Sequence, residues 1–166
     1  MEQNWVVSTS PHLRSPESTR RIMWQVSLAL APAGLWGLYV FGWGAAYVMA
    51  LCVVTAVLTE AAVQRFRGVP VTVSDGSAFL TGLLLAYCLP AYTVVQGEGG
   101  ATLKMLPPYV PIVGAFVAVA IGKQAFGGLG HNIWNPALVG RAFVQIGFAG
   151  HVSLTRWPWP MGKTPD

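Results

Sequence analysis

Apolar residues fill long uninterrupted windows of the sequence, and short polar stretches separate them. An α-helix needs about 20 apolar residues to cross the ~30 Å hydrocarbon core of a bilayer, and the first four windows approach this length. The fifth window is shorter and contains Arg141. The windows are residues 22–41, 43–64, 78–96, 105–122 and 137–150. The pattern predicts an all-α, polytopic membrane protein with about five transmembrane or half-membrane helices.

Basic residues beside the windows predict the orientation of the helices. Arg20 and Arg21 precede the first window, and Arg65 and Arg67 follow the second one. Because Lys and Arg are enriched in cytoplasmic segments, we expect the N-terminus and the loop after the second window in the cytoplasm. The chain then divides into a cytoplasmic N-terminal segment, a transmembrane domain and an external tail. Their boundaries are residues 1–21, 22–150 and 151–166.

The composition agrees with a membrane environment. Of the 166 residues, 54% are hydrophobic and 10% are charged, against about 25% charged residues in a typical soluble domain. The formal net charge of +4 does not indicate nucleic-acid binding, because the arginines flank apolar windows. Cys52 and Cys88 lie inside windows and are interpreted as packing residues. No second His or Cys lies near His131 in the sequence, so we predict no metal site, and we assign no catalytic residue.

Two windows start at a polar residue that favours a helix N-terminus. Asp75 precedes the third window, Asn135 precedes the fifth, and Pro136 suits the first helical position. Pro90 inside the third window and the shortness of the fifth are typical of discontinuous helices around a membrane-embedded site. Non-helical backbone at that depth must be buried in protein or line a wet cavity. We therefore expect partner subunits or further membrane spans.

Two asparagines lie three residues apart, after a glycine cluster, in "GKQAFGGLGHNIWNPALVGRAF". Carboxamides offer donors and acceptors without charge, so Asn132 and Asn135 suit a flat polar edge such as that of an isoalloxazine ring. The start of the following helix favours a reduced, anionic ring. Gly128 and Gly130 allow a ligand close to the backbone. The alternative is structural: Asn135 caps its helix and Asn132 satisfies loop carbonyls, and the spacing alone favours this alternative.

The same motif, together with "SDGSAFLTGLLLAYCLP" and "SPHLRSPESTRRIMWQVSLALAP", resembles the RnfD-type membrane subunit of Rnf ion-translocating electron transport complexes. It also resembles the homologous NqrB-type membrane subunit of the Na+-translocating NADH:quinone reductase. The similarity covers nearly the whole chain, which looks like the N-terminal half of these subunits. It implies the first half of an inverted-repeat, channel-like fold in the bacterial inner membrane. The implied partners are other subunits of such a complex, membrane lipid and a second half of the subunit.

The resemblance also implies a cofactor and its position. In the family, the asparagine pair belongs to a non-covalent flavin site, for riboflavin or FMN, which maps onto Asn132 and Asn135. Family members further attach FMN covalently to a threonine in a Ser-Gly-Ala-Thr motif. That motif is absent from this sequence, so neither Thr155 nor Thr164 takes the role.

Four other polar residues are weaker site candidates. Asp75 is a candidate for a cation path or the flavin edge, and helix capping explains it equally well. Glu60 is a candidate for the ion path, although its closeness to Arg65 also fits snorkelling to the interface. Lys123 and Arg141 are candidates to pair with carbonyls or a flavin phosphate, and an interfacial anchor is favoured for Lys123.

Two functions stay open at the level of the sequence. The first is a flavin-carrying membrane subunit of a redox-driven Na+/H+ translocating oxidoreductase, active only within a multisubunit complex. The second is a cofactor-free membrane scaffold or a small-solute or ion channel-like subunit.

Overall fold

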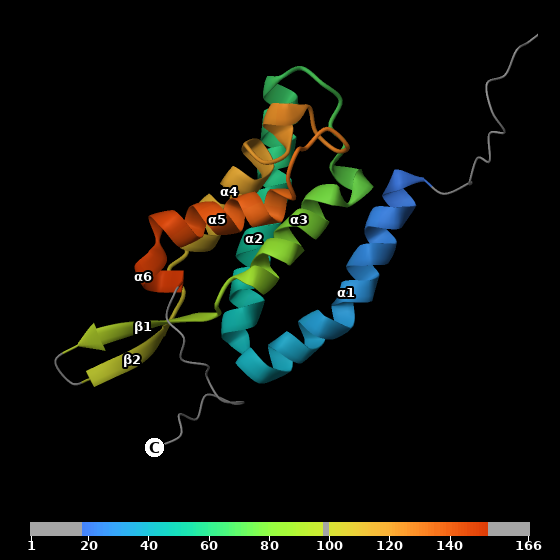
Figure 1. Cartoon of the computed structure of the whole chain (residues 1–166). Coiled ribbons are helices and arrows are strands. Elements are labelled where there is room, and N and C mark those ends of the chain that lie inside the picture. The colour runs from blue at the N-terminus through green and yellow to red at the C-terminus, as the bar shows by residue number, and fades with distance from the viewer. Residues whose placement is uncertain (1–17, 98–99, 153–166) are drawn as a thin grey trace, which may run out of the picture.

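Helices make up most of the protein in a computed structural model that describes residues 18–97 and 100–152 (Figure 1). The long helices α1 (Thr19–Phe41) and α2 (Trp43–Phe66) run in opposite directions on either side of Gly42. The remaining elements, in order, are η1 (Val73–Asp75), α3 (Ser77–Cys88), β1 (Tyr92–Gly97), β2 (Gly100–Met105), α4 (Tyr109–Ala120), η2 (Gln124–Phe126), α5 (Pro136–Gly147) and α6 (Ala149–Val152).

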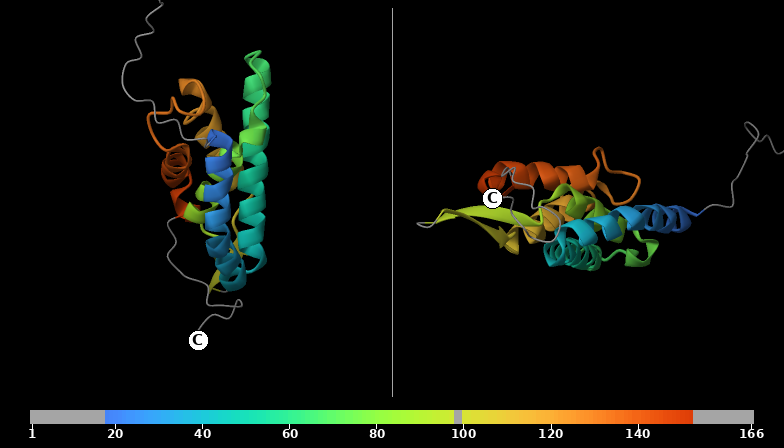
Figure 2. Two further views of the ribbon diagram at one scale, coloured as in Figure 1. Left: turned by 90° about the vertical axis from the view of Figure 1, so that its right-hand side faces the viewer. Right: turned by 90° about the horizontal axis from the view of Figure 1, so that it is seen from below.

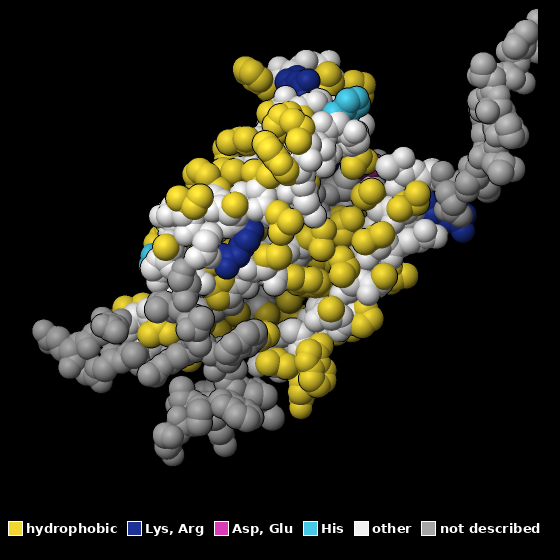
Figure 3. Space-filling view, in the orientation of Figure 1, with side chains coloured by type: hydrophobic (Ala, Val, Ile, Leu, Met, Phe, Trp, Pro, Cys, Tyr) yellow, Lys and Arg dark blue, Asp and Glu magenta, His cyan; other side chains and the backbone are white. Residues whose placement is uncertain are grey.

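Three stretches of the described chain are long and apolar enough to cross a bilayer. They are Thr19–Phe41, Trp43–Phe66 and Tyr109–Phe126. These stretches confirm the predicted spans at 22–41, 43–64 and 105–122. Large apolar side chains such as Leu35 and Leu58 remain exposed on α1 and α2, and hydrophobic side chains cover much of the face in Figure 3. The prediction of a helical, polytopic membrane protein is confirmed.

The predicted third span, residues 78–96, is wrong in its second half. Helix α3 ends at Cys88, and Leu89 is extended, with φ −103° and ψ 144°. The reason is Pro90, whose ring disfavours the helical conformation of the residue before it. Residues 92–97 instead form β1, which pairs antiparallel with β2, a strand that begins between the third and fourth windows. A two-stranded hairpin is therefore added to the expected all-α architecture.

The third and fifth segments are short helices, as expected for half-membrane elements. Helices α3 and α5 have 12 residues each, or about 18 Å, well under the hydrocarbon thickness. Asn135 is the N-cap of α5: its side chain accepts from the amide of Ala137 at 3.0 Å, and Pro136 follows it. At α3 the N-cap is Gly76, and the Asp75 carboxylate accepts from the Ser77 amide at 2.7 Å. The predicted cap at Asn135 is confirmed, whereas Asp75 lies one position before the N-cap of α3.

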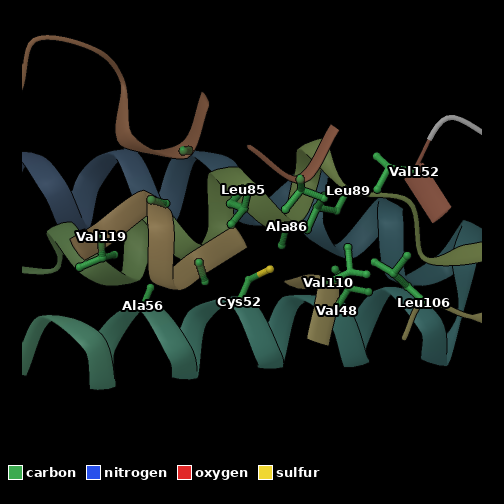
Figure 4. Close-up of a cluster of buried hydrophobic side chains, with 14 residues drawn as sticks. Val48, Cys52, Ala56, Leu85, Ala86, Leu89, Leu106, Val110, Val119 and Val152 are labelled. Carbon is green, nitrogen blue, oxygen red and sulfur yellow. The ribbon is translucent and has the colours of Figure 1, made fainter. Parts of the chain in front are cut away.

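The buried core lies between α2, α3 and α4, with α5 against α3 and α4. In Figure 4, Val48, Cys52 and Ala56 of α2 face side chains of α3 and α4. A Cβ atom at Gly82 of α3 would lie only 2.7 Å from the Cα atom of Val53. Glycine therefore lets α3 approach the backbone of α2 closely, and this contact aligns the start of α3 with the last third of α2.

The two ends of the bundle carry different structures. The loop between α2 and η1 lies at the same end as the glycine-rich loop after η2, and the β1–β2 hairpin lies at the other end (Figures 1 and 2). Arg67 joins the two loops by donating from Nη1 to the Gln124 carbonyl at 2.8 Å. The predicted N-terminal segment and tail lie almost entirely outside the described residues, so their predicted locations stay predictions.

Candidate functional site

A buried ion pair lies at the loop end of the bundle. Lys123, just after α4, donates from Nζ to both carboxylate oxygens of Glu60 on α2, at 2.7 and 2.8 Å. Only 2% of Lys123 and 1% of Glu60 are exposed. The interpretation of Lys123 as an interfacial anchor is therefore wrong, and so is snorkelling for Glu60. A charge at this depth needs a partner of opposite charge and further hydrogen bonds, and each of these residues supplies the partner for the other.

Two buried glutamine side chains complete the surroundings of Glu60. Gln124 donates to Glu60 Oε1 at 2.9 Å, and Gln64, one helical turn after Glu60, donates to the same atom at 3.2 Å. The Gln64 amide also donates to Thr72 Oγ1 and accepts from the Thr72 amide, at 2.8 and 2.9 Å. These bonds bind the loop after α2 to the ion pair.

Ser77 connects the ion pair to Asp75. Its hydroxyl accepts from Lys123 Nζ and donates to Asp75 Oδ1, each at 2.5 Å. Hydrogen bonds thus run from Asp75, through Ser77 and Lys123, to Glu60. The structure brings together the two residues that the sequence suggested for an ion path, Asp75 and Glu60, although 15 positions separate them in the chain. Their shared partner is the ammonium group of Lys123.

A cavity of about 240 Å³ lies beside this network and receives both asparagines of the glycine-rich motif. Polar side chains from three places reach its wall: Ser77 and Thr81 from α3, Lys123 from the end of α4, and Asn132 and Asn135 from the loop before α5. Apolar residues make up the rest of the lining: Met23, Leu80, Leu84, Leu129 and Pro136. This cavity is the candidate functional site.

Each asparagine has one structural hydrogen bond and one unused group. Asn132 donates from Nδ2 to the Trp134 carbonyl at 3.2 Å, and Asn135 Oδ1 accepts the capping bond from Ala137. Both structural roles suggested by the sequence are therefore present. Among the described residues, Asn132 Oδ1 and Asn135 Nδ2 have no hydrogen-bond partner. The pair still offers one acceptor and one donor to a ligand.

The structure separates the other proposed flavin contacts from this cavity. Gly128 and Gly130 have the positive φ angles of 95° and 89° expected of the loop, but neither lines the cavity. Arg141 lines a different cavity, near the end of α3. Of the residues proposed for cofactor binding, the cavity therefore contains Asn132, Asn135 and Lys123, without the two glycines and Arg141.

Sequence reasoning missed Ser77 and Thr81, which line the cavity, and it missed Gln64 and Gln124, which donate to Glu60 beside it. Each is a polar residue in a largely apolar segment, and buried polar groups in membranes are expected to have a partner. That signal was present in "SDGSAF" and "GKQAF". The partner itself was not visible, because 63 positions separate Lys123 from Glu60.

Comparison with known proteins shows the family of this chain. The chain is 44% identical over 153 residues to a subunit of the "Proton-translocating ferredoxin:NAD(+) oxidoreductase complex" of Clostridium ljungdahlii, covering 92% of this chain and 42% of that protein. It is 43% identical over 156 residues to a subunit of the "Na(+)-translocating ferredoxin:NAD(+) oxidoreductase complex" of Acetobacterium woodii, covering 94% and 45%. The chain thus spans less than half the length of these relatives. Residues 6–164 match the NQR2, RnfD, RnfE family, and the chain belongs to that family.

Proposed function

We propose that this chain contributes a flavin-binding site to the membrane subunit of an ion-translocating oxidoreductase complex. Its relatives include subunits of complexes that are named as proton- or Na(+)-translocating ferredoxin:NAD(+) oxidoreductases. The observation that carries the proposal is the single cavity that gathers Asn132, Asn135 and Lys123 at the start of a short helix. In this proposal the remaining partners are other subunits of the complex and the rest of the subunit length.

The unused groups of the asparagines fit the edge of an isoalloxazine ring. That edge alternates carbonyl oxygens with N–H groups, so it needs donors and acceptors close together. Asn135 Nδ2 supplies a donor and Asn132 Oδ1 an acceptor, and the Ser77 and Thr81 hydroxyls line the same wall. The volume of about 240 Å³ is below the ~300 Å³ of small ligand pockets. The described residues therefore hold one edge of the ring rather than its whole body.

The ion pair gives the same site a place for charge. A flavin bound at this edge supplies the electron transfer chemistry. Lys123 lines the cavity with a positive charge, and it neutralises Glu60 on its other side. Additional negative charge in the cavity competes with Glu60 for this ammonium group. We propose that Glu60, linked to Asp75 through Lys123 and Ser77, belongs to the ion path that such competition controls.

The test is the flavin content of the assembled complex. Losing one hydrogen bond and leaving its partner unpaired costs about 1–3 kcal/mol, or roughly five- to hundredfold in affinity. The complex with Asn132→Leu is therefore expected to contain less acid-extractable flavin than the wild-type complex. Asn135→Ser keeps a capping oxygen and removes the Nδ2 donor, so it is expected to lower flavin content while α5 stays folded. Gln25→Leu, on the exposed side of α1, is the matched control.

A cofactor-free scaffold is the second candidate, and the structural bonds of both asparagines favour it. Asn132 satisfies the Trp134 carbonyl and Asn135 caps α5 without any ligand. In that case Asn132→Leu, Asn135→Ser and Gln25→Leu all give complexes with the flavin content of wild type. Such a result would remove the flavin proposal and leave the amides as structural groups.

A further inference from the structure

A larger cavity, of about 550 Å³, lies at the hairpin end of the bundle. The second half of α1, the first turns of α2, the end of α3 and Arg141 of α5 form its wall. Apart from Arg141, this wall is mainly aliphatic and aromatic, with residues such as Ala45, Val48 and Leu89. It shares no lining residue with the cavity beside Asn132.

Among residues 18–97 and 100–152, no acceptor pairs with the guanidinium group of Arg141. Its Nη1 atom is buried and has no hydrogen-bond partner among the described residues. The hydroxyls of the nearby tyrosines make other bonds: Tyr87 donates to the Leu30 carbonyl at 3.0 Å, Tyr92 donates to the Phe41 carbonyl at 3.1 Å, and Tyr92 also accepts from the Gly44 amide at 3.3 Å. A buried donor on a charged group is costly to leave unpaired. An anionic oxygen from a ligand in the cavity would suit this guanidinium group.

The aromatic residues near this cavity indicate its depth in the bilayer. Trp36, Tyr39 and Trp43 flank Gly42 at the junction of α1 and α2, and their exposed fractions are 67%, 63% and 86%. Exposed Trp and Tyr side chains are typical of the level of lipid head groups. Trp36 also lines the cavity. The cavity therefore lies beside the head-group level, next to a helix whose apolar side chains face lipid.

We propose that this cavity binds an anionic phospholipid, with the phosphate oxygens accepting hydrogen bonds from Arg141. Guanidinium groups bind phosphate well because their N–H groups form a planar fork, and basic pockets between membrane helices bind anionic head groups. The apolar wall made by α1 and α3 contacts the upper part of the acyl chains.

The test measures the phospholipids that remain with the assembled complex after extensive washing in mild detergent. Mass spectrometry after solvent extraction identifies and counts them. Wild type is expected to retain an anionic phospholipid in a fixed ratio to this chain. Arg141→Gln removes the charge-assisted hydrogen bond and is expected to lower retention about tenfold or more. Lys104→Gln, which removes an exposed charge on β2, is the matched control and is expected to retain the lipid.

A second variant blocks the cavity and leaves Arg141 in place. Gly37 of α1 lines the cavity, and a Cβ atom there would meet no atom within 4 Å. The Cβ atom of Gly37→Leu therefore meets open space, and leucine raises helix propensity. We expect this variant to assemble and to lose the lipid, with the flavin content unchanged.

Three results would overturn the proposal. The first is equal lipid retention by wild type, Arg141→Gln and Gly37→Leu. The second is a wild-type complex that retains no anionic phospholipid after washing. The third is a wild-type complex that releases a water-soluble phosphate ester in place of a lipid, when the Arg141→Gln complex releases none.

Discussion

The ion pair between Lys123 and Glu60 makes a quantitative prediction for the stability of the bundle. Lys123→Met removes the ammonium group that contacts both carboxylate oxygens at 2.7 and 2.8 Å. Glu60, 1% exposed, then keeps only the neutral donors of Gln64 and Gln124. Breaking a buried pair on one side typically destabilises a protein by about 3–5 kcal/mol. Glu60→Gln leaves Lys123 without its anion and is expected to cost a similar amount.

The double variant Glu60→Gln/Lys123→Met distinguishes a coupled pair from two independent residues. Replacing both charges together is often nearly neutral, because the cost of burying the charges disappears with their attraction. We expect the double variant to lose less than about 2 kcal/mol. The interaction energy in the mutant cycle is then several kcal/mol, whereas distant residues without shared partners give nearly additive losses.

The measurement is reversible unfolding of the reconstituted protein in mixed micelles, followed by tryptophan fluorescence over an SDS titration. Lys104→Met, at an exposed position of β2, serves as the control and is expected to change stability by less than ~0.5 kcal/mol. If the loss in the double variant equals the sum of the two single losses, Lys123 and Glu60 are not coupled. The argument for a buried network around Glu60 would then be refuted.

Two further predictions concern packing and orientation. A Cβ atom at Gly140 of α5 would overlap the Gly114 carbonyl of α4 and lie 2.8 Å from Ala118 Cβ, so Gly140→Val is expected to destabilise the bundle by about 1–3 kcal/mol. Gly147→Ala in the same helix is the control, because a Cβ atom there meets no atom within 4 Å. The measurement is thermal unfolding in detergent, and an equal loss of stability in both variants would contradict this packing. For orientation, cysteines at Ser74 and Lys104 in a Cys88→Ser background are expected to react with membrane-impermeant maleimide from opposite sides, with Ser74 cytoplasmic. Labelling of both cysteines from one side would contradict the assignment of the loop end and the hairpin end of the bundle to opposite sides of the membrane.

The long helices were predictable because the signals for them are local. Each of the windows at 22–41 and 43–64 contains enough apolar residues to cross a bilayer, whatever the rest of the chain does. The cap at Asn135 was predictable for the same reason, since a capping bond joins groups only two positions apart. The error at the third window arose because hydrophobicity alone set its end. Pro90 was visible in the sequence, and its effect on Leu89 ends α3 at Cys88.

The candidate site was only partly predictable. The sequence suggested Glu60, Asp75, Lys123, Asn132 and Asn135 one by one, each with a structural alternative. The favoured interpretation of Lys123 as an interfacial anchor was wrong, and so was the snorkelling alternative for Glu60. Both rested on the rule that a charged residue near the end of an apolar window usually reaches water. The flavin role of the asparagines stays a prediction, and their capping and loop bonds are confirmed.

Residues close together in the sequence determine where the helices lie, where they start and that they reside in a membrane. These features do not depend on the tertiary structure. The tertiary structure decided which polar residues meet. Close packing of α3 on α2 at Gly82 and the turn after α4 bring Glu60, Ser77 and Lys123 into hydrogen-bonding distance. The same packing leaves Arg141 in a separate cavity without a partner among the described residues. These contacts depend on the distances between whole helices, and no spacing within a single segment of the sequence contains that information.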